Sequence, residues 1–159
     1  MRHRRLAAPQ VYKLQLGPRA QYQVALGGAL RSGFHDPATR QCPKLYVVMQ
    51  RHEIHYVGVT NQPMSSRINF GLKAKGKGGY HGYKWKNIRG SLKLIVYSFP
   101  DQNGAQFLLE LETVEAELVF HVRKETGKWP ISQTEIRFHQ PTRAHLAAVQ
   151  NVFALCKAV

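Results

Sequence analysis

Two tyrosines, Tyr46 and Tyr56, carry phenol groups that can donate, accept or transfer protons. Each lies in a run rich in Val, Leu, Ile and Tyr, and the polar residues 50–53 separate the two runs, which indicates a β-hairpin. If the turn centres near Arg51, Tyr46 pairs with Tyr56 across the hairpin. Residues 46, 48, 54, 56 and 58 then share one face, where Gly58 leaves room for the backbone of a ligand. The simpler interpretation is a pair of half-buried strand tyrosines.

An arginine and a glutamate on two predicted helices could complete a site around these phenols. Apolar residues that recur every fourth position predict a helix over 63–74, with Arg67 beside its apolar stripe. A similar stripe predicts a helix over 104–126, with Glu115 at the border between core and solvent. A guanidinium suits a phosphate, and a carboxylate suits a divalent cation. The simpler interpretation of Glu115 is a helix-surface carboxylate with partners one turn away.

The order Tyr, Tyr, Arg, Glu resembles the GIY-YIG nuclease superfamily, over roughly residues 44–133. Lys44-Leu45-Tyr46 stands where that family has Gly-Ile-Tyr, and Tyr56-Val57-Gly58 fits its second signature closely. The resemblance implies a small α/β sandwich of the α+β type, in which helices flank a three-stranded antiparallel sheet. It also implies one divalent metal ion per site, Mg²⁺ or Mn²⁺.

The resemblance implies a role for each matched residue. Glu115 would hold the metal ion, and Arg67 would clamp the scissile phosphate. Tyr46 would orient the attacking water and take its proton, while Tyr56 would hold the water or the phosphate by hydrogen bonds. A phenol is a poor base at neutral pH, so Tyr46 needs nearby cations that lower its pKa. Arg67 and the metal ion are the candidates for that effect.

Two positions depart from the family pattern. Some members carry a histidine one turn after the arginine, where this chain has Gly71, and His81 or Tyr83 could reach the same space from the following loop. We therefore count His81 among the candidate catalytic residues, with a surface histidine of no particular task as the alternative. Many members also have an asparagine after the proline that ends the glutamate helix, and here only Ser132 or Gln133 stands nearby.

Residues 73–90 have the composition of a nucleic-acid contact loop. Lysines neutralise phosphates, aromatic rings offer faces for unstacked bases, and glycines free the backbone. The residues expected to contact nucleic acid are Lys73, Lys75, Lys77, Tyr80, Tyr83, Lys84, Trp85, Lys86 and Arg89. The alternative is a solvated flexible loop whose aromatic rings pack on the body of the protein.

Composition and charge set the class of protein independently of any family. With 159 residues and 43% hydrophobic content, the chain is long enough for one domain with a real core. A formal net charge of +14, from 23 Lys and Arg against 9 Asp and Glu, favours a polyanionic partner, with DNA ahead of RNA. We expect no membrane partner and a cytoplasmic location, because no apolar run could span a bilayer and no secretory signal follows the charged start. Cys42 and Cys156 are expected to be free thiols.

The predicted elements divide one globular domain into three segments. Residues 1–43 form a basic leader and N-terminal addition, residues 44–138 the nuclease-like core, and residues 139–159 a C-terminal helix packed on that core. We expect the leader, residues 1–9, to be mobile. Besides the hairpin and the two helices, the patterns predict strands over 11–16, 91–99 and 131–138 and a helix over 142–157, whereas residues 20–32 stay ambiguous.

The leading hypothesis is a metal-dependent DNA endonuclease that acts in restriction, repair or DNA mobility. The second is a nucleic-acid-binding module of the same fold that does not cut, and the third is a basic RNA-binding protein in which the tyrosines only pack. The sequence leaves the recognised DNA sequence and dimerisation open. An enzyme with one site per chain needs two copies, or two successive nicks, to cut both strands of a duplex. The terminal helix is the candidate interface of such a dimer.

Overall fold

The computed structural model describes residues 8–28, 32–134 and 136–159. Most of the predicted mobile leader, residues 1–7, therefore lies outside the described residues. None of the helices within the described ranges combines the length and the apolar character that crossing a membrane requires.

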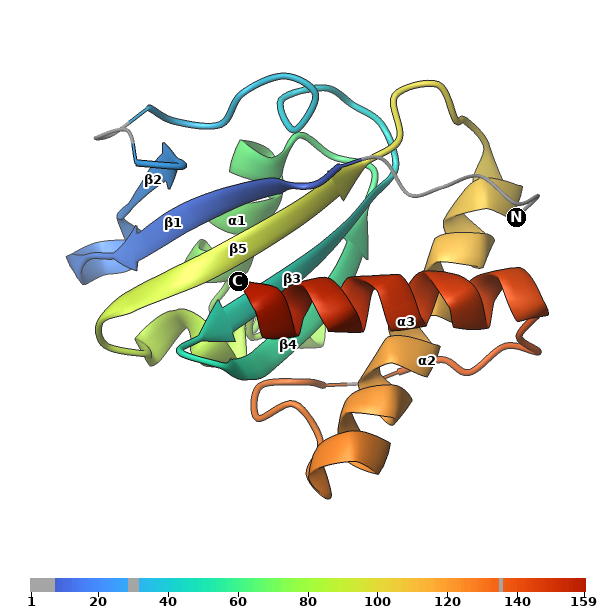
Figure 1. Ribbon diagram of the computed structural model, residues 1–159. Helices are drawn as coiled ribbons and strands as arrows, with labels where there is room; N and C mark the ends of the chain where they lie inside the picture. The colour runs from blue at the N-terminus through green and yellow to red at the C-terminus, as the bar shows by residue number, and fades with distance from the viewer. Residues whose placement is uncertain (1–7, 29–31, 135) are drawn as a thin grey trace.

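The described residues form an α+β fold around a five-stranded antiparallel sheet in the order β2-β1-β5-β3-β4 (Figure 1). Its strands are β1 (Gln10–Leu16), β2 (Tyr22–Leu26), β3 (Lys44–Gln50), β4 (Glu53–Thr60) and β5 (Ser91–Ser98). The sheet thus has two strands more than the expected three: β5, β3 and β4 are neighbours, and β1 and β2 extend the sheet beyond β5. The ambiguous residues 20–32 contain β2, which pairs with β1 in an N-terminal hairpin, and β1 then pairs with β5.

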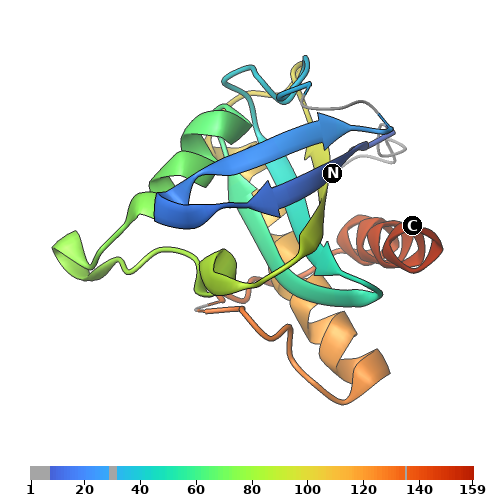
Figure 2. The ribbon, with the colours of Figure 1, turned by 90° about the vertical axis from the view of Figure 1, so that its left-hand side faces the viewer.

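Helices cover both faces of the sheet (Figures 1 and 2). One face carries α1 (Met64–Lys73), and the other carries α2 (Ala105–Thr126) and α3 (Arg143–Ala158). All three lie where the apolar stripes predict them. Strand β3, which lies between β5 and β4, is buried from Lys44 to Met49, because apolar side chains on both of its faces pack into separate cores.

The β3–β4 hairpin differs in register from the expected pairing. Tyr46 lies opposite Gly58, and Tyr56 lies opposite Val48, so the two tyrosines are diagonal neighbours. The turn lies between Gln50 and Glu53, and a β-bulge after Val48 leaves His55 as an extra residue on β4. This extra residue reverses the alternation, so Ile54 packs on the α2–α3 side. The expectation that Ile54 shares the face of the tyrosines is therefore wrong.

The edge of β4 is protected without a further strand. The predicted strand over 131–138 is wrong for its described residues, which have no strand structure, and residue 135 lies outside them. Instead, the backbone N–H of Ser132 donates to the carbonyl of His55 at 2.8 Å. The side chain of Gln133 accepts from the backbone N–H of Val57 at 2.9 Å and donates to its carbonyl at 3.0 Å. These bonds satisfy backbone groups that an edge strand otherwise exposes.

Candidate active site

A hydrogen-bonded cluster joins β3, α1 and the loop after α1 on one face of the sheet. The hydroxyls of Tyr46 and Tyr83 lie 2.9 Å apart, and Nε of Arg67 donates to the Tyr46 hydroxyl at 3.2 Å. The Tyr83 hydroxyl also lies 3.4 Å from the backbone carbonyl of Arg67, and the guanidinium lies over the Tyr83 ring at 5.3 Å. The ring of Tyr56 packs against the rings of Tyr46 and Tyr83, with centroid separations of 5.9 Å and 5.4 Å. The structure thus brings three phenols and one guanidinium together.

Tyr83, and not His81, occupies the space beside Gly71. A Cβ atom added to Gly71 would overlap the Tyr83 ring, so the absence of a side chain on α1 is what admits the ring. His81 is exposed and lies against Gly76 in the loop. The structure thus leaves His81 outside the hydrogen-bonded cluster, and its catalytic role stays a prediction.

Replacing Gly71 by Ala is expected to destabilise the protein by about 1–2 kcal/mol. Overpacking against Tyr83 costs about 1–3 kcal/mol, and the better helix propensity of Ala returns about 1 kcal/mol at most. Denaturant unfolding measures the difference. Gly28→Ala is the matched control, because its added Cβ meets no atom within 4 Å. A Gly71→Ala protein as stable as the parent would show that the Tyr83 ring is not fixed in this place.

The sequence suggested that Gly58 leaves room for a ligand, but in the structure this glycine makes room for the two tyrosine rings. A Cβ atom at Gly58 would lie 2.6 Å from the Tyr46 hydroxyl and 2.7 Å from a ring carbon of Tyr56. The space above this glycine is therefore filled by the two phenol rings themselves. Gly58, the last residue of the Tyr56-Val57-Gly58 motif, thus allows the rings of Tyr46 and Tyr56 to pack closely.

Glu115 on α2 acts electrostatically on the same cluster. Since α2 packs on β4, the edge strand that carries Tyr56, the carboxyl is near enough to raise the pKa of Tyr56. Burial raises the pKa of Glu115 itself to about 8, the charge of Glu112 adds to this, and Arg67 opposes it. The carboxyl is partly buried, as its position beside the apolar stripe predicts. Of the four residues expected at the site, Tyr46, Tyr56 and Arg67 lie in contact, and Glu115 is near enough to affect the pKa of Tyr56 and to respond to the charge of Arg67.

Burial governs the protonation of the phenols. It raises the pKa of Tyr46 well above 10, an effect that Tyr83 strengthens and Arg67 opposes. Burial likewise raises the pKa values of Tyr56 and Tyr83. The expectation that Arg67 lowers the pKa of Tyr46 is met in direction, but burial outweighs it. Arg67 itself keeps its charge, because the hydroxyls of Tyr46 and Tyr83 offset the opposing effect of burial on its pKa.

The raised pKa of Glu115 predicts how stability depends on pH. In the unfolded chain a glutamate ionises near pH 4.3, whereas in the folded protein Glu115 holds its proton to about pH 8. The folded state therefore binds more protons between these values, and its stability falls as pH rises through them. Glu115→Gln removes this loss, so from pH 5 to pH 8 the metal-free variant gains about 3.5 kcal/mol over the parent. Denaturant unfolding at the two pH values tests this, and parallel behaviour of the two proteins would contradict it.

The Glu115 carboxyl group fits a hard divalent cation whose other ligands are water molecules and phosphate oxygens. Among the described residues no three His, Cys, Asp or Glu side chains gather to hold a metal ion. Glu115 offers one carboxylate in partly buried surroundings, and Mg²⁺ is often bound by one or two carboxylates together with substrate phosphates and waters. A single ion held by Glu115 and by substrate is therefore consistent with the residues present.

The predicted contact loop divides into buried and exposed residues. Trp85 is fully buried, Tyr83 nearly so, and their rings stack at 4.3 Å. Their assignment to base contacts is wrong, because neither ring has a free face at the surface. Lys86 also uses its ammonium group within the loop, since it donates to the carbonyls of Ala74 at 3.1 Å and His81 at 2.7 Å.

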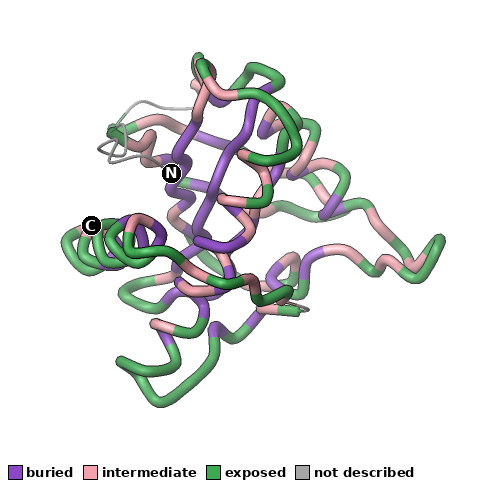
Figure 3. Tube along the Cα trace, turned by 90° about the vertical axis from the view of Figure 1, so that its right-hand side faces the viewer, coloured by how far each residue is buried: buried purple, intermediate pink, exposed green. Residues whose placement is uncertain are grey.

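The remaining loop residues stay at the surface. Lys73, Lys75, Lys77, Lys84 and Arg89 are exposed, and Tyr80 is partly exposed. The loop protrudes from the body of the molecule beyond α1 (Figures 2 and 3). These residues keep the predicted charge and the predicted access to a polyanion.

The sequence leaves the choice between His81 and Tyr83 open, and it gives no sign of the role of Lys44. Gly71, followed by aromatic residues in the next loop, is the signal that favours Tyr83. Lys44, in place of the family glycine, is fully buried and donates to the carbonyls of Arg40, Cys42 and Gln62. It anchors the start of β3 to its flanking loops, a role with no signal in local sequence. Cys42 and Cys156 are both buried and free, as expected.

Comparison of the chain with protein-family models, with curated proteins and with solved structures gives no match.

Proposed function

We propose that the protein is a metal-dependent endonuclease of the GIY-YIG type that hydrolyses phosphodiester bonds in DNA. The observation that supports this most is the gathering of Arg67 and three tyrosines from four separate segments into one cluster, with Glu115 of α2 near enough to affect the pKa of Tyr56. Packing alone would not require a charged guanidinium and a carboxyl group beside buried phenols, since burying such groups costs free energy. The order of these residues along the chain supports the same family.

In this proposal Arg67 binds the scissile phosphate. Its Nε donates to Tyr46 at 3.2 Å, and its position over the Tyr83 ring at 5.3 Å restricts the guanidinium further. The remaining N–H groups of the fork can donate to two phosphate oxygens, and a donor held in place before the reaction stabilises charge that develops in the transition state. Tyr46 and Tyr83 thus orient the arginine.

Glu115 would hold one Mg²⁺ or Mn²⁺ ion, which when bound supplies positive charge to the phosphoryl oxygens. The carboxyl group must lose its proton to bind a cation, so we expect binding to weaken as pH falls below about 8. Tyr56, close enough to feel the charge of Glu115, would hold the attacking water or the phosphate by its hydroxyl. Tyr46 would take the proton of the water, and this requires that the bound substrate and cation lower its raised pKa.

A second function, a nucleic-acid-binding module that does not cut, is favoured by one observation. Tyr46 is 0% exposed, and burial raises its pKa, so the base of the proposed reaction has no direct access to solvent. Such a module would keep the charged loop and would bind DNA without hydrolysis. The set of Arg67 and Glu115 together argues for the enzyme, because a module without catalysis has no use for the carboxyl group.

Supercoiled plasmid incubated with the protein and Mg²⁺ or Mn²⁺ tests the proposed function. We expect nicked circles that require the metal ion and disappear with a chelator. Binding of the same plasmid without any nicking, over a range of both metals and of pH from 6 to 9, would reject the enzyme and leave the binding module. Stronger binding of RNA than of DNA at the same salt concentration would favour an RNA-binding protein.

The exposed lysines of the loop make a separate prediction about DNA binding. Removing both charges in Lys75→Ala/Lys77→Ala is expected to lower the salt dependence of binding, because each phosphate contact contributes about 0.9 to the slope of log K against log salt concentration. Fluorescence anisotropy with a short duplex from low to high salt measures the slope. Lys124→Ala/Lys128→Ala, which removes two exposed charges near the end of α2, serves as the control. Equal slopes for the two double variants would show that the loop does not contact phosphates.

A further inference from the structure

Phe70 is exposed to an extent that packing does not explain. Its side chain is 55% exposed, whereas the apolar stripe that fixes α1 to the sheet consists of Met64, Ile68 and Leu72, all buried. A single exposed phenylalanine is ordinary, but this one stacks on a second ring. The rings of Phe70 and Tyr80 lie 5.1 Å apart with an angle of only 9° between their planes. The pair offers a flat apolar surface at the end of α1.

The loop holds this pair in place. The backbone N–H of Gly76 donates to the carbonyl of Tyr80 at 3.0 Å, and Gly79 donates to Gly76 at 3.0 Å. Gly76 has a φ of +98°, which a residue with a side chain rarely adopts, so the tight turn depends on this glycine. Lys86 fastens both ends of the loop through its bonds to Ala74 and His81. The ring pair is therefore ordered before any ligand binds.

The ring pair also adjoins the proposed phosphate clamp. Phe70 follows Arg67 on α1 by one helical turn, so the two side chains lie on neighbouring parts of the helix surface. Tyr80 is near enough to the cluster that its hydroxyl affects the pKa values of Arg67 and Tyr83. Three exposed lysines, Lys73, Lys75 and Lys77, come from the end of α1 and from the same loop. A flat aromatic surface, a guanidinium and a row of ammonium groups thus lie together.

We propose that the Phe70–Tyr80 pair is a stacking site for one unpaired nucleobase next to the phosphate held by Arg67. A base in a continuous duplex has both faces covered by its neighbours, whereas an unpaired base can place one face on an aromatic ring. The preferred substrate is accordingly DNA with a single-stranded, looped or flapped segment at the cleaved bond. This preference rests on the proposed function, but the stacking site itself does not require that the protein cuts.

Binding of metal-free full-length protein to two fluorescent oligonucleotides tests the site. One is a single strand with 2-aminopurine at its centre, and the other is a blunt duplex of the same sequence. We expect the single strand to bind more tightly and its 2-aminopurine fluorescence to fall on binding. Phe70→Ala should weaken binding of the single strand about tenfold, the scale of a lost base–ring stack, and change binding of the duplex less than about twofold. Its salt slope should stay the same, because no phosphate contact is removed.

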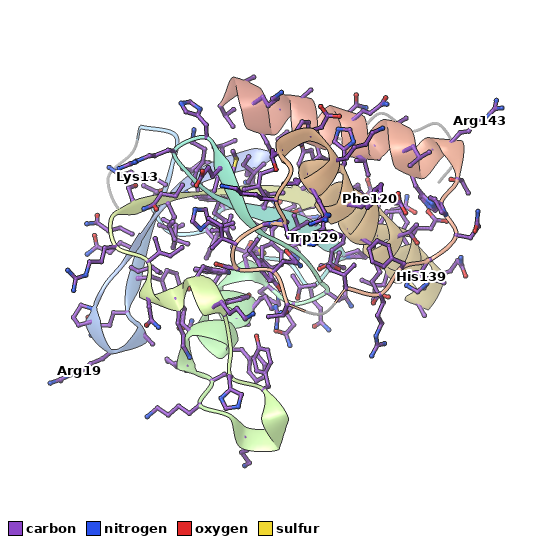
Figure 4. All side chains as sticks on the ribbon, turned by 90° about the horizontal axis from the view of Figure 1, so that it is seen from below. Lys13, Arg19, Phe120, Trp129, His139 and Arg143 are labelled. Carbon is purple, nitrogen blue, oxygen red and sulfur yellow. The ribbon has the colours of Figure 1, made fainter. Side chains whose placement is uncertain are left out.

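Two further variants separate stacking from a structural role of the ring. Phe70→Trp keeps a flat surface and should restore affinity for the single strand, whereas a ring that only supports the loop would be disturbed by the larger side chain. Phe120→Ala removes a ring that is 48% exposed on α2 and should leave both affinities unchanged. Figure 4 shows Phe120 on α2, well away from the loop.

The outcomes for the stacking site and for the proposed function differ. Equal losses for single strand and duplex in Phe70→Ala, or 2-aminopurine fluorescence that does not fall with the parent protein, would overturn the stacking site. Nicking of plasmid by a protein that fails these tests would keep the nuclease and reject only the site. Stacking by a protein that never cuts would keep the site and reject the nuclease.

Discussion

Replacing Glu115 by Gln is expected to reduce metal-dependent cleavage of DNA by about 10³-fold or more while leaving DNA binding unchanged. The amide has the size of the carboxyl group but no charge to hold a divalent cation, and charge stabilisation by such a cation contributes several kcal/mol to catalysis. The variant should also fold well, because a neutral amide removes the cost of burying a carboxylate near Glu112. Cleavage rates on plasmid with Mg²⁺, together with binding by anisotropy, measure the two effects separately.

Glu125→Gln is the matched control for this prediction. Glu125 lies on the same helix but is exposed near its end, so the same loss of one charge there should leave cleavage within about twofold of the parent. Full activity in Glu115→Gln would remove Glu115 from the site. A loss of cleavage in both variants would indicate that overall charge, and not a particular carboxylate, is what matters.

Replacing Arg67 by Lys is expected to slow cleavage by about 10²-fold. Lysine keeps the positive charge, but its ammonium group is a point charge that cannot donate to Tyr46 through Nε and bind a phosphate through two further N–H groups at once. The size of the loss follows from removing one preorganised donor in a site that stabilises developing charge. Single-turnover rates at saturating DNA report this step apart from binding.

The control for Arg67→Lys is Arg123→Lys. Arg123 also lies over an aromatic ring, that of Trp129 at 4.9 Å, but it sits at the exposed end of α2. Its replacement should not change the rate. If Arg67→Lys cleaves as fast as the parent, a positive charge is all that this position needs, and the proposed fork-like contact with phosphate is wrong.

Local periodicity was sufficient to predict the helices and most strands. The stripe through Ile68 and Leu72 predicted α1, and Gly127, with a φ of +76°, ends α2 where the sequence indicated a stop. The relation between Arg67, Glu115 and the tyrosines was inferred from their order along the chain. The structure brings Arg67 and the tyrosines into contact and places Glu115 near enough to affect the pKa of Tyr56, whereas a joint catalytic role stays a prediction. The sequence alone therefore predicts which helix or strand carries each candidate side chain.

The remaining features depend on contacts between distant parts of the chain. The pairing of β1 with β5 enlarges the sheet, and no short-range pattern specifies which strands become neighbours. The bulge at His55 shifts the register by one residue, a change that alternation alone does not reveal. Gly71 leaves space on α1 for the Tyr83 ring, and Trp85 stacks on that ring, so both residues belong to the core. Their residue types alone suggested a nucleic-acid contact. The exposed partner of Tyr80, Phe70, was not distinguished from other apolar helix residues.

The most direct test of the central claim is a crystal structure of the protein with a DNA oligonucleotide and Ca²⁺, a divalent ion chosen in the expectation that it binds without supporting cleavage. We predict a phosphate within hydrogen-bond distance of the Arg67 guanidinium and an ion coordinated by both Glu115 and that phosphate. An ion bound elsewhere, or a DNA backbone that passes Arg67 and Glu115 without contact, would contradict the proposed site.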